Sequence, residues 1–135
     1  MEPISDLLLD THIVMWMAID PDRIPLPLLE GIEAAKHCFV SHVTALEIQW
    51  KALKSGPHFT FSLGHLERTM REFSLKELPI VYQDIKRLGE MTFLHRDPFD
   101  RLLMAQAAQK DLPLVTVDKD ILLTFKRYKQ FRAFK

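Results

Sequence analysis

The chain has 135 residues and is 47% apolar, which fits one domain with its own core and excludes a disordered polypeptide. Eighteen basic residues balance eighteen acidic ones, so any contact with a polyanion depends on local positive charge or on bound metal. Cys38 is the single cysteine, which excludes an intrachain disulfide and a cysteine metal cage.

Strand and helix signals alternate along the chain. Short apolar runs predict buried strands, and longer stretches with apolar residues three or four apart predict helices. The predicted strands are 7–10, 38–41, 75–78 and 114–117. The predicted helices are 11–19, 28–36, 44–54, 63–73, 82–91, 98–110 and 119–125. This alternation predicts an α/β fold in which a parallel sheet carries helices on both faces, as a single domain over residues 1–135.

The two ends of the chain differ in charge. Glu2 and Asp6 stand where a signal peptide carries positive charge, and the apolar run 13–19 is too short to span a bilayer. We therefore expect a cytoplasmic protein without a membrane anchor. The segment from Lys119 to the end of the sequence is basic, and Asp120 is its one acidic residue. It is interpreted either as a solvated surface or as a contact for phosphate. Its basic residues are Lys119, Lys126, Arg127, Lys129, Arg132 and Lys135.

Four carboxylates stand at the boundaries of predicted elements. Asp10 closes the first strand, Asp118 follows the last strand, Asp100 opens a helical stretch, and Glu47 lies beside the apolar face of the third helix. In open parallel sheets ligands bind beyond the carboxyl ends of the strands, so these acids are predicted to converge. Convergent carboxylates predict a site for Mg²⁺ or Mn²⁺, with Asp10 and Asp100 as the main ligands. Glu47 and Asp118 then complete a second metal site or hold waters.

Each acid also has a purely structural interpretation. Asp97 precedes a proline and is a natural helix N-cap, and Asp100 then lies in the first turn, where a carboxylate favours the helix dipole. Thr44 and Glu47 have the spacing of a capping box, and Asp118 precedes the last predicted helix as a cap. Capping alone leaves two questions open, which are why every cap is acidic and why two of these acids follow buried strands.

The third predicted helix has an apolar side on which Val43, Leu46, Trp50 and Leu53 lie, with Glu47 at its edge. An unpaired charge there is costly.

The histidines offer a rival site. His12, His42 and His95 lie near the acids, and neutral imidazole suits zinc or manganese. No His-Glu-x-x-His spacing occurs, which argues against zinc hydrolase chemistry.

Four segments together resemble the four signature blocks of PIN-domain proteins, in the expected order between Leu7 and Asp120. They are Leu7-Leu8-Leu9-Asp10-Thr11-His12, Ser41-His42-Val43-Thr44-Ala45-Leu46-Glu47-Ile48, His95-Arg96-Asp97-Pro98-Phe99-Asp100-Arg101-Leu102-Leu103-Met104-Ala105-Gln106-Ala107 and Leu114-Val115-Thr116-Val117-Asp118. The third block is the most specific and resembles the PilT N-terminus group of small PIN proteins, to which the VapC-type toxins belong. Two departures are modest, because Val117 replaces an alanine and Leu46 a tryptophan without removing an oxygen ligand.

The resemblance implies a three-layer α/β/α fold and a metal-dependent endoribonuclease that uses Mg²⁺ or Mn²⁺. The four acids of the family motif are matched in this sequence by Asp10, Glu47, Asp100 and Asp118. The residues it implies in auxiliary roles are Asp97 and Asp120 as further acids, Thr11 and Thr116 as hydroxyls that orient carboxylates, and Arg101 as a phosphate contact or helix brace.

The resemblance also implies the toxin half of a toxin–antitoxin pair, acting on RNA as a homodimer, with an antitoxin chain that covers the acidic cleft. Candidates for the antitoxin contact are Trp50, Phe59, Phe61 and Leu63, for each of which core packing is the simpler interpretation. The alternative function is a PIN-fold module that binds RNA or protein in a regulatory role without cleaving.

Overall fold

The computed structural model describes residues 6–58, 60–91, 97–127 and 132–134. Its sheet has four strands, namely β1 (Leu7–Leu9), β2 (Cys38–Ser41), β3 (Lys76–Leu78) and β4 (Leu114–Val115). Their order is β3-β2-β1-β4, and every neighbouring pair is parallel. The predicted α/β fold with a parallel sheet is therefore confirmed. β4 ends two residues earlier than predicted, where the Thr116 hydroxyl accepts a hydrogen bond from the Asp118 N–H and turns the chain.

The seven predicted helices are all present among the described residues. They are α1 (Thr11–Ile19), α2 (Leu26–Ala34), α3 (His42–Ser55), α4 (Leu63–Glu72), α5 (Tyr82–Glu90), α6 (Pro98–Lys110) and α7 (Lys119–Arg127). Short 3₁₀ turns follow α1 at Pro21–Arg23 and α3 at Gly56–His58. Because Ser41 Oγ accepts from the Val43 N–H at 2.9 Å, α3 begins at His42, two residues before the predicted start.

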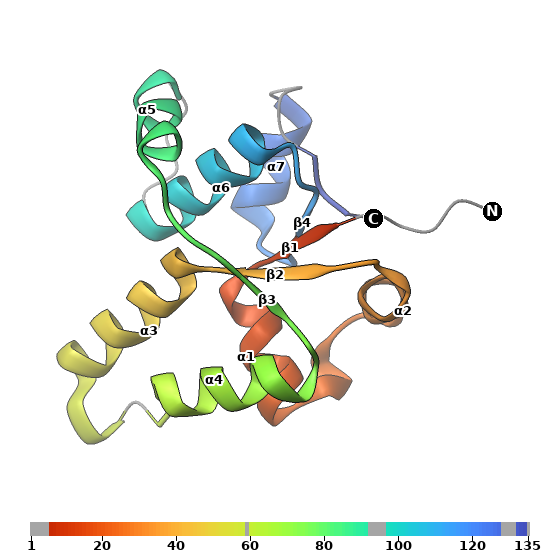
Figure 1. Cartoon of the computed structure of the whole chain (residues 1–135), viewed down its shortest axis with the longest axis vertical. Helices are drawn as coiled ribbons and strands as arrows, with labels where there is room; N and C mark the ends of the chain where they lie inside the picture. Colours follow the sequence, from red (N-terminus) through yellow and green to blue (C-terminus); the bar gives the residue numbers. More distant parts are fainter. Residues whose placement is uncertain (1–5, 59, 92–96, 128–131, 135) are drawn as a thin grey trace.

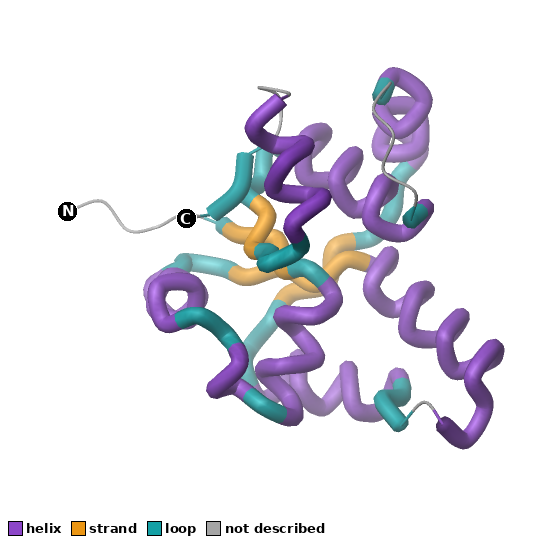
Figure 2. The backbone as a smooth tube through the Cα atoms, turned by 180° about the vertical axis from the view of Figure 1, so that it is seen from behind, coloured by secondary structure: helices purple, strands orange, loops and turns teal. Residues whose placement is uncertain are grey.

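Alternating side chains of the strands build two cores, one on each face of the sheet. Leu7 and Leu9 point to the face covered by α1, α2 and α4, whereas Leu8 points to the face covered by α6 and α7 (Figure 1). The view from behind shows the strands enclosed between these helical layers (Figure 2). The arrangement is an α/β/α sandwich, and α3 reaches both cores through Ile48 on one side and Val43 on the other.

Helix α3 differs from its prediction in which side it buries. Its buried residues are Val43, Thr44, Glu47 and Ile48. Leu46, Trp50 and Leu53 lie on the outside with 49%, 51% and 78% of their surface exposed. Of the four apolar residues that the sequence places on one side of this helix only Val43 is buried, and core packing, the simpler interpretation of Trp50, is wrong. In the described part of the chain no helix is both long and apolar enough to cross a membrane.

Candidate active site

Asp10 lies directly after β1 and is only 2% exposed. Its Oδ1 accepts a hydrogen bond from the Thr11 N–H at 2.8 Å, which makes Asp10 the N-cap of α1. Its Oδ2 accepts from the Thr116 hydroxyl at 2.8 Å, across the β1–β4 pair. Burial raises the pKa of Asp10, while the bonds from Thr116 and Thr11 act to lower it. The carboxylate is thus held in one orientation by two neighbouring strands.

Glu47 projects inward from α3 and is 3% exposed. Its Oε2 pairs with Lys51 Nζ at 2.8 Å, one turn further along the helix. The Thr44 hydroxyl on the same face shares a 3.0 Å hydrogen bond with the Thr11 hydroxyl, which joins α3 to α1 beside Asp10. The capping-box interpretation of Glu47 is wrong, because Ser41 rather than Thr44 caps α3. Capping does not explain this buried carboxylate.

Asp97 and Asp100 occupy the start of α6. Asp97 Oδ1 accepts from the Phe99 N–H at 2.9 Å and the Asp100 N–H at 3.4 Å, so the predicted N-cap is confirmed. Burial and repulsion from four surrounding carboxylates together raise the pKa of Asp100 from 3.8 to about 8, and burial is the largest single cause. In order of effect these carboxylates belong to Asp97, Asp10, Glu47 and Asp118. Acids from three other elements of the fold therefore face Asp100.

Asp118 both caps a helix and acts electrostatically on Asp100. Its Oδ1 accepts from the Ile121 N–H at 3.0 Å, so it caps α7 as the structural interpretation predicted, and it contributes to the repulsion on Asp100. Asp120 is exposed in the first turn of α7 and is not among the carboxylates that raise the pKa of Asp100.

The auxiliary residues differ in what they contact. The Thr116 hydroxyl orients Asp10 and accepts from the Asp118 N–H, so it links two of the acids. The Thr11 hydroxyl bonds to Thr44 instead, and Thr11 reaches Asp10 only through its backbone N–H. Arg101 Nε is buried and has no hydrogen-bond partner among the described residues.

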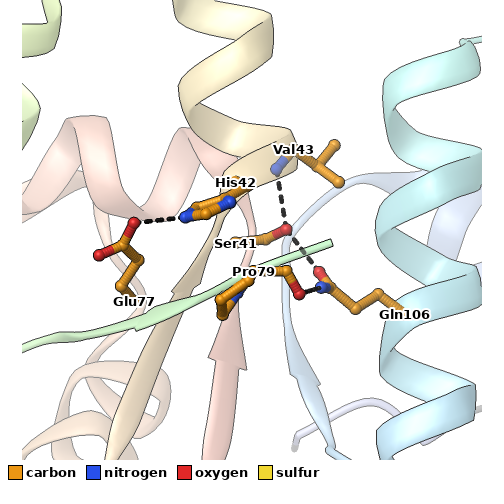
Figure 3. Close-up of polar contacts among 6 residues, drawn as sticks. All are labelled: Ser41, His42, Val43, Glu77, Pro79 and Gln106. Atoms are coloured by element: carbon orange, nitrogen blue, oxygen red, sulfur yellow. Dashed lines mark hydrogen bonds and ion pairs between the residues drawn. The ribbon is translucent and has the colours of Figure 1, made fainter. Parts of the chain in front are cut away.

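The described histidines differ in their relation to this site. His12 is exposed but lies near enough to Asp10 to help lower the pKa of that carboxyl, whereas His42 Nε2 pairs with Glu77 of β3 (Figure 3). His95 lies outside the described residues, as does Phe59. Within the described ranges, no three carboxylate, imidazole or thiolate side chains are close enough to form a ready-made metal cage. The four acids are therefore electrostatic neighbours rather than a closed coordination shell.

Two buried polar features were not predicted from the sequence. One is the contact between Thr11 and Thr44, which were interpreted separately as an orienting hydroxyl and a capping residue. The other is the role of Gln106, which is fully buried. The spacing of Ser41 before Val43 was an available signal of an N-cap, whereas no local pattern marks the partner of a buried glutamine.

The geometry defines a class of protein, namely an α/β sandwich with carboxylates beyond the carboxyl ends of β1 and β4. The chain belongs to the PIN-domain family, whose model, described as PIN domain, matches residues 7–129. No protein with curated annotation matches it.

Solved structures that share the fold include a member of the VapBC family of toxin–antitoxin systems. VapBC2 from Rickettsia felis, bound to a DNA fragment from its promoter, is 18% identical with a TM-score of 0.66, over 96% of this chain and 97% of that one. VapBC-5 from Mycobacterium tuberculosis is 16% identical with a TM-score of 0.63, over 96% and 98%. VapBC-1 from nontypeable Haemophilus influenzae is 14% identical with a TM-score of 0.61, over 96% and 97%. At such identities the likeness establishes the fold.

Proposed function

We propose that this PIN domain is a metal-dependent endoribonuclease that hydrolyses RNA phosphodiester bonds. The observation that carries the proposal is the convergence on Asp100 of carboxylates from β1, α3 and the β4–α7 junction. Capping explains the positions of Asp10, Asp97 and Asp118 taken singly, but it explains neither this convergence nor the buried Glu47.

The donor set fits Mg²⁺ or Mn²⁺. All four side chains offer carboxylate oxygen, which hard cations prefer. Burial is the largest cause of the raised pKa of Asp100, and a divalent cation would relieve the repulsion from neighbouring carboxylates that adds to it. Asp10 and Asp100 would be the main ligands, with Glu47 and Asp118 holding a second ion or bound waters. When bound, such a cation supplies an activated water and stabilises charge on the phosphate and the leaving oxygen.

The chain's own residues contribute orientation. Thr116 and the Thr11 N–H hold the two oxygens of Asp10, so that ligand needs little reorganisation. Lys51 pairs with Glu47 and offsets part of the cost of its burial.

A groove that reaches Thr116, the residue that orients Asp10, offers room for the RNA backbone. It has a volume of about 820 Å³ and carries Lys119, Lys126 and Arg132 of the basic segment among mostly apolar side chains, and none of the four acids lines it. Because the chain is neutral in bulk, such local positive charge is what phosphate requires. This supports the phosphate-contact interpretation of the C-terminal lysines.

The direct test removes ligand charge without changing shape. Asp10→Asn and Asp100→Asn are expected to lower Mg²⁺-dependent or Mn²⁺-dependent cleavage of an RNA mixture by at least about a hundredfold, while circular dichroism stays native. Asp22→Asn, at an exposed aspartate after α1, is the matched control and should keep full activity. Activity that survives a chelator, or survives both substitutions in folded protein, would favour the non-cleaving regulatory module.

We further propose that the protein acts as the toxin of a toxin–antitoxin pair. The structural neighbour from Mycobacterium tuberculosis is a member of a family of toxin–antitoxin systems, and this chain presents an apolar side of α3 on which Leu46, Trp50 and Leu53 are exposed. Of the predicted antitoxin contacts, Trp50 is half exposed and suits a partner, Leu63 is partly buried, and Phe61 is 4% exposed and belongs to the core. The homodimer and the cytoplasmic setting belong to this proposal as predictions.

Expression tests the toxin role. The chain expressed alone should arrest growth, and co-expression with a small protein encoded beside it should restore growth and yield a stable complex. Trp50→Ser should weaken recovery of that complex while leaving the isolated domain folded. Unimpaired growth on expression of active enzyme would contradict the toxin role and leave the ribonuclease activity standing.

A further inference from the structure

A fully buried glutamine joins three separate segments below the acid site. Gln106 of α6 is 0% exposed, and its side chain points to the junction of β2 and α3 (Figure 3). Its Oε1 accepts a hydrogen bond from the Ser41 hydroxyl. Its Nε2 donates to the Pro79 carbonyl at 3.0 Å and to Asp84 Oδ2 at 3.2 Å. The amide therefore contacts the start of α3, the loop after β3 and the first turn of α5.

Only one orientation of the amide satisfies these partners. The Pro79 carbonyl and the Asp84 carboxylate only accept, so they require the NH₂ group and leave the Gln106 oxygen for the Ser41 hydroxyl. The Ser41 hydroxyl proton is thereby committed to Gln106, and its oxygen accepts from the Val43 N–H as the N-cap of α3. Asp84 in turn accepts from the Val81 N–H at 3.0 Å and is itself fully buried.

A connected network of this kind specifies one arrangement of the segments it joins. Burying an amide and a carboxylate is costly unless both are hydrogen-bonded, and a shift of α3 relative to α6 would break several of these bonds together. Glu47 is carried by α3 and Asp100 by α6, so the relative position of these helices sets where the two carboxylates stand.

We propose that Gln106 is a positioning residue, which holds the capped start of α3 against α6 and thereby sets the placement of Glu47 relative to Asp100. This inference rests on the ribonuclease function for its kinetic consequence, but its structural consequence stands independently. Misplacement of reacting groups by about 1 Å can lower a rate by roughly 100-fold, so a small shift of α3 suffices.

The test replaces Gln106 by a residue of similar length that cannot form the bonds. Gln106→Met is expected to lower kcat roughly 10- to 100-fold with KM changed less than about twofold, since Gln106 holds no substrate. Gln109→Met, at an exposed position of the same helix, is the matched control and should change neither constant. Leu66→Ala, at a core residue of α4, controls for a loss of stability alone, and activities are compared at equal fraction folded.

A distance measurement separates positioning from stability. Spin labels on cysteines at exposed positions Lys54 of α3 and Gln109 of α6 report the spacing of the helices. Burial raises the pKa of the Cys38 thiol to about 11, so the native cysteine labels slowly. Gln106→Met should shift or broaden the distance distribution, and Leu66→Ala should leave it as in the unsubstituted protein.

Ser41→Ala removes the hydroxyl that donates to Gln106 and should produce the same change in distance. If Gln106→Met fails to fold, the distance in Ser41→Ala tests the positioning role. An unchanged distance distribution in the folded variant, or a kcat no lower than that of Leu66→Ala, would overturn the positioning role. Absence of activity in the unsubstituted protein would instead remove the ribonuclease proposal, and the distances would still decide whether Gln106 positions α3.

Discussion

Helices α3 and α4 follow one another in the chain and differ in how they treat charged and apolar residues. In α4 the apolar Leu66 is 3% exposed, while Glu67 and Arg68 lie in solvent. Helix α3 also buries the apolar Val43 and Ile48, but its charged Glu47 is 3% exposed while Trp50 is 51% exposed. Apolar burial therefore accounts for Leu66 of α4 but not for Glu47 and Trp50 of α3. A helix that violates the apolar-inside pattern is where function is expected to have overridden packing.

The orientation of α3 is explained by polar contacts at its start. Ser41 caps the helix and bonds to Gln106, and Thr44 bonds to Thr11 on α1. These contacts turn Glu47 toward the site, where Lys51 pairs with it. The apolar side is consequently left outside, where a protein partner would recover the hydrophobic stabilisation that the monomer forgoes.

The difference between α3 and α4 is tested most directly by replacing one leucine with alanine in each helix. Leu66→Ala should destabilise the fold by about 2–5 kcal/mol, because it opens a cavity in a packed core. Leu46→Ala, at a half-exposed position of α3, should stay within about 0.5 kcal/mol. Urea unfolding followed by circular dichroism measures both. Equal losses would mean that the outer side of α3 is packed in the isolated domain.

The role of the buried glutamate of α3 is tested by comparing the same substitution at Glu47 and at the exposed Glu67 of α4. Glu47→Gln should lower RNA cleavage roughly 10- to 100-fold, because it removes a carboxylate from the site without changing its shape. Glu67→Gln on the exposed side of α4 should leave the rate unchanged. Initial rates at saturating Mg²⁺ are the measurement. Full activity of Glu47→Gln would reduce this buried acid to a structural residue.

The pH dependence of stability tests whether the pKa of Asp100 is raised in the folded state. Asp100 has a pKa of about 8 in the folded state against 3.8 for a free aspartate, so the folded state holds the proton more tightly. Metal-free protein should therefore lose stability as the pH rises from about 4 toward about 8, and Asp100→Asn should flatten that slope. Urea unfolding at several pH values with chelator checks this. A slope unchanged by the substitution would place the titration elsewhere.

The smallest effect is expected at Asp97, where the structure shows a cap. Asp97→Asn should change stability by less than about 0.5 kcal/mol, since asparagine caps as well as aspartate, whereas Asp97→Ala should cost about 1 kcal/mol. Cleavage should fall less in Asp97→Asn than in Glu47→Gln. A larger loss of activity with unchanged stability would move Asp97 from the cap into the catalytic group.

The sequence by itself was sufficient for the elements, the parallel α/β class and the family. Strands such as Cys38–Ser41 and helices such as Pro98–Lys110 match their predicted bounds, because apolar period, proline and caps act within a few residues. The caps at Asp97 and Asp118 are confirmed for the same reason. Features that depend on neighbouring residues were therefore predictable from the sequence.

Tertiary structure alone decided how these elements face one another. Thr116 orients Asp10 from a position 106 residues away, and Ser41 meets Gln106 across 65 residues, contacts that no local pattern encodes. The same holds for α3, whose apolar residues predicted a buried side that the structure leaves exposed. The physical reason is that burial depends on which distant segments pack together, and buried polar groups bind wherever the assembled fold supplies a partner.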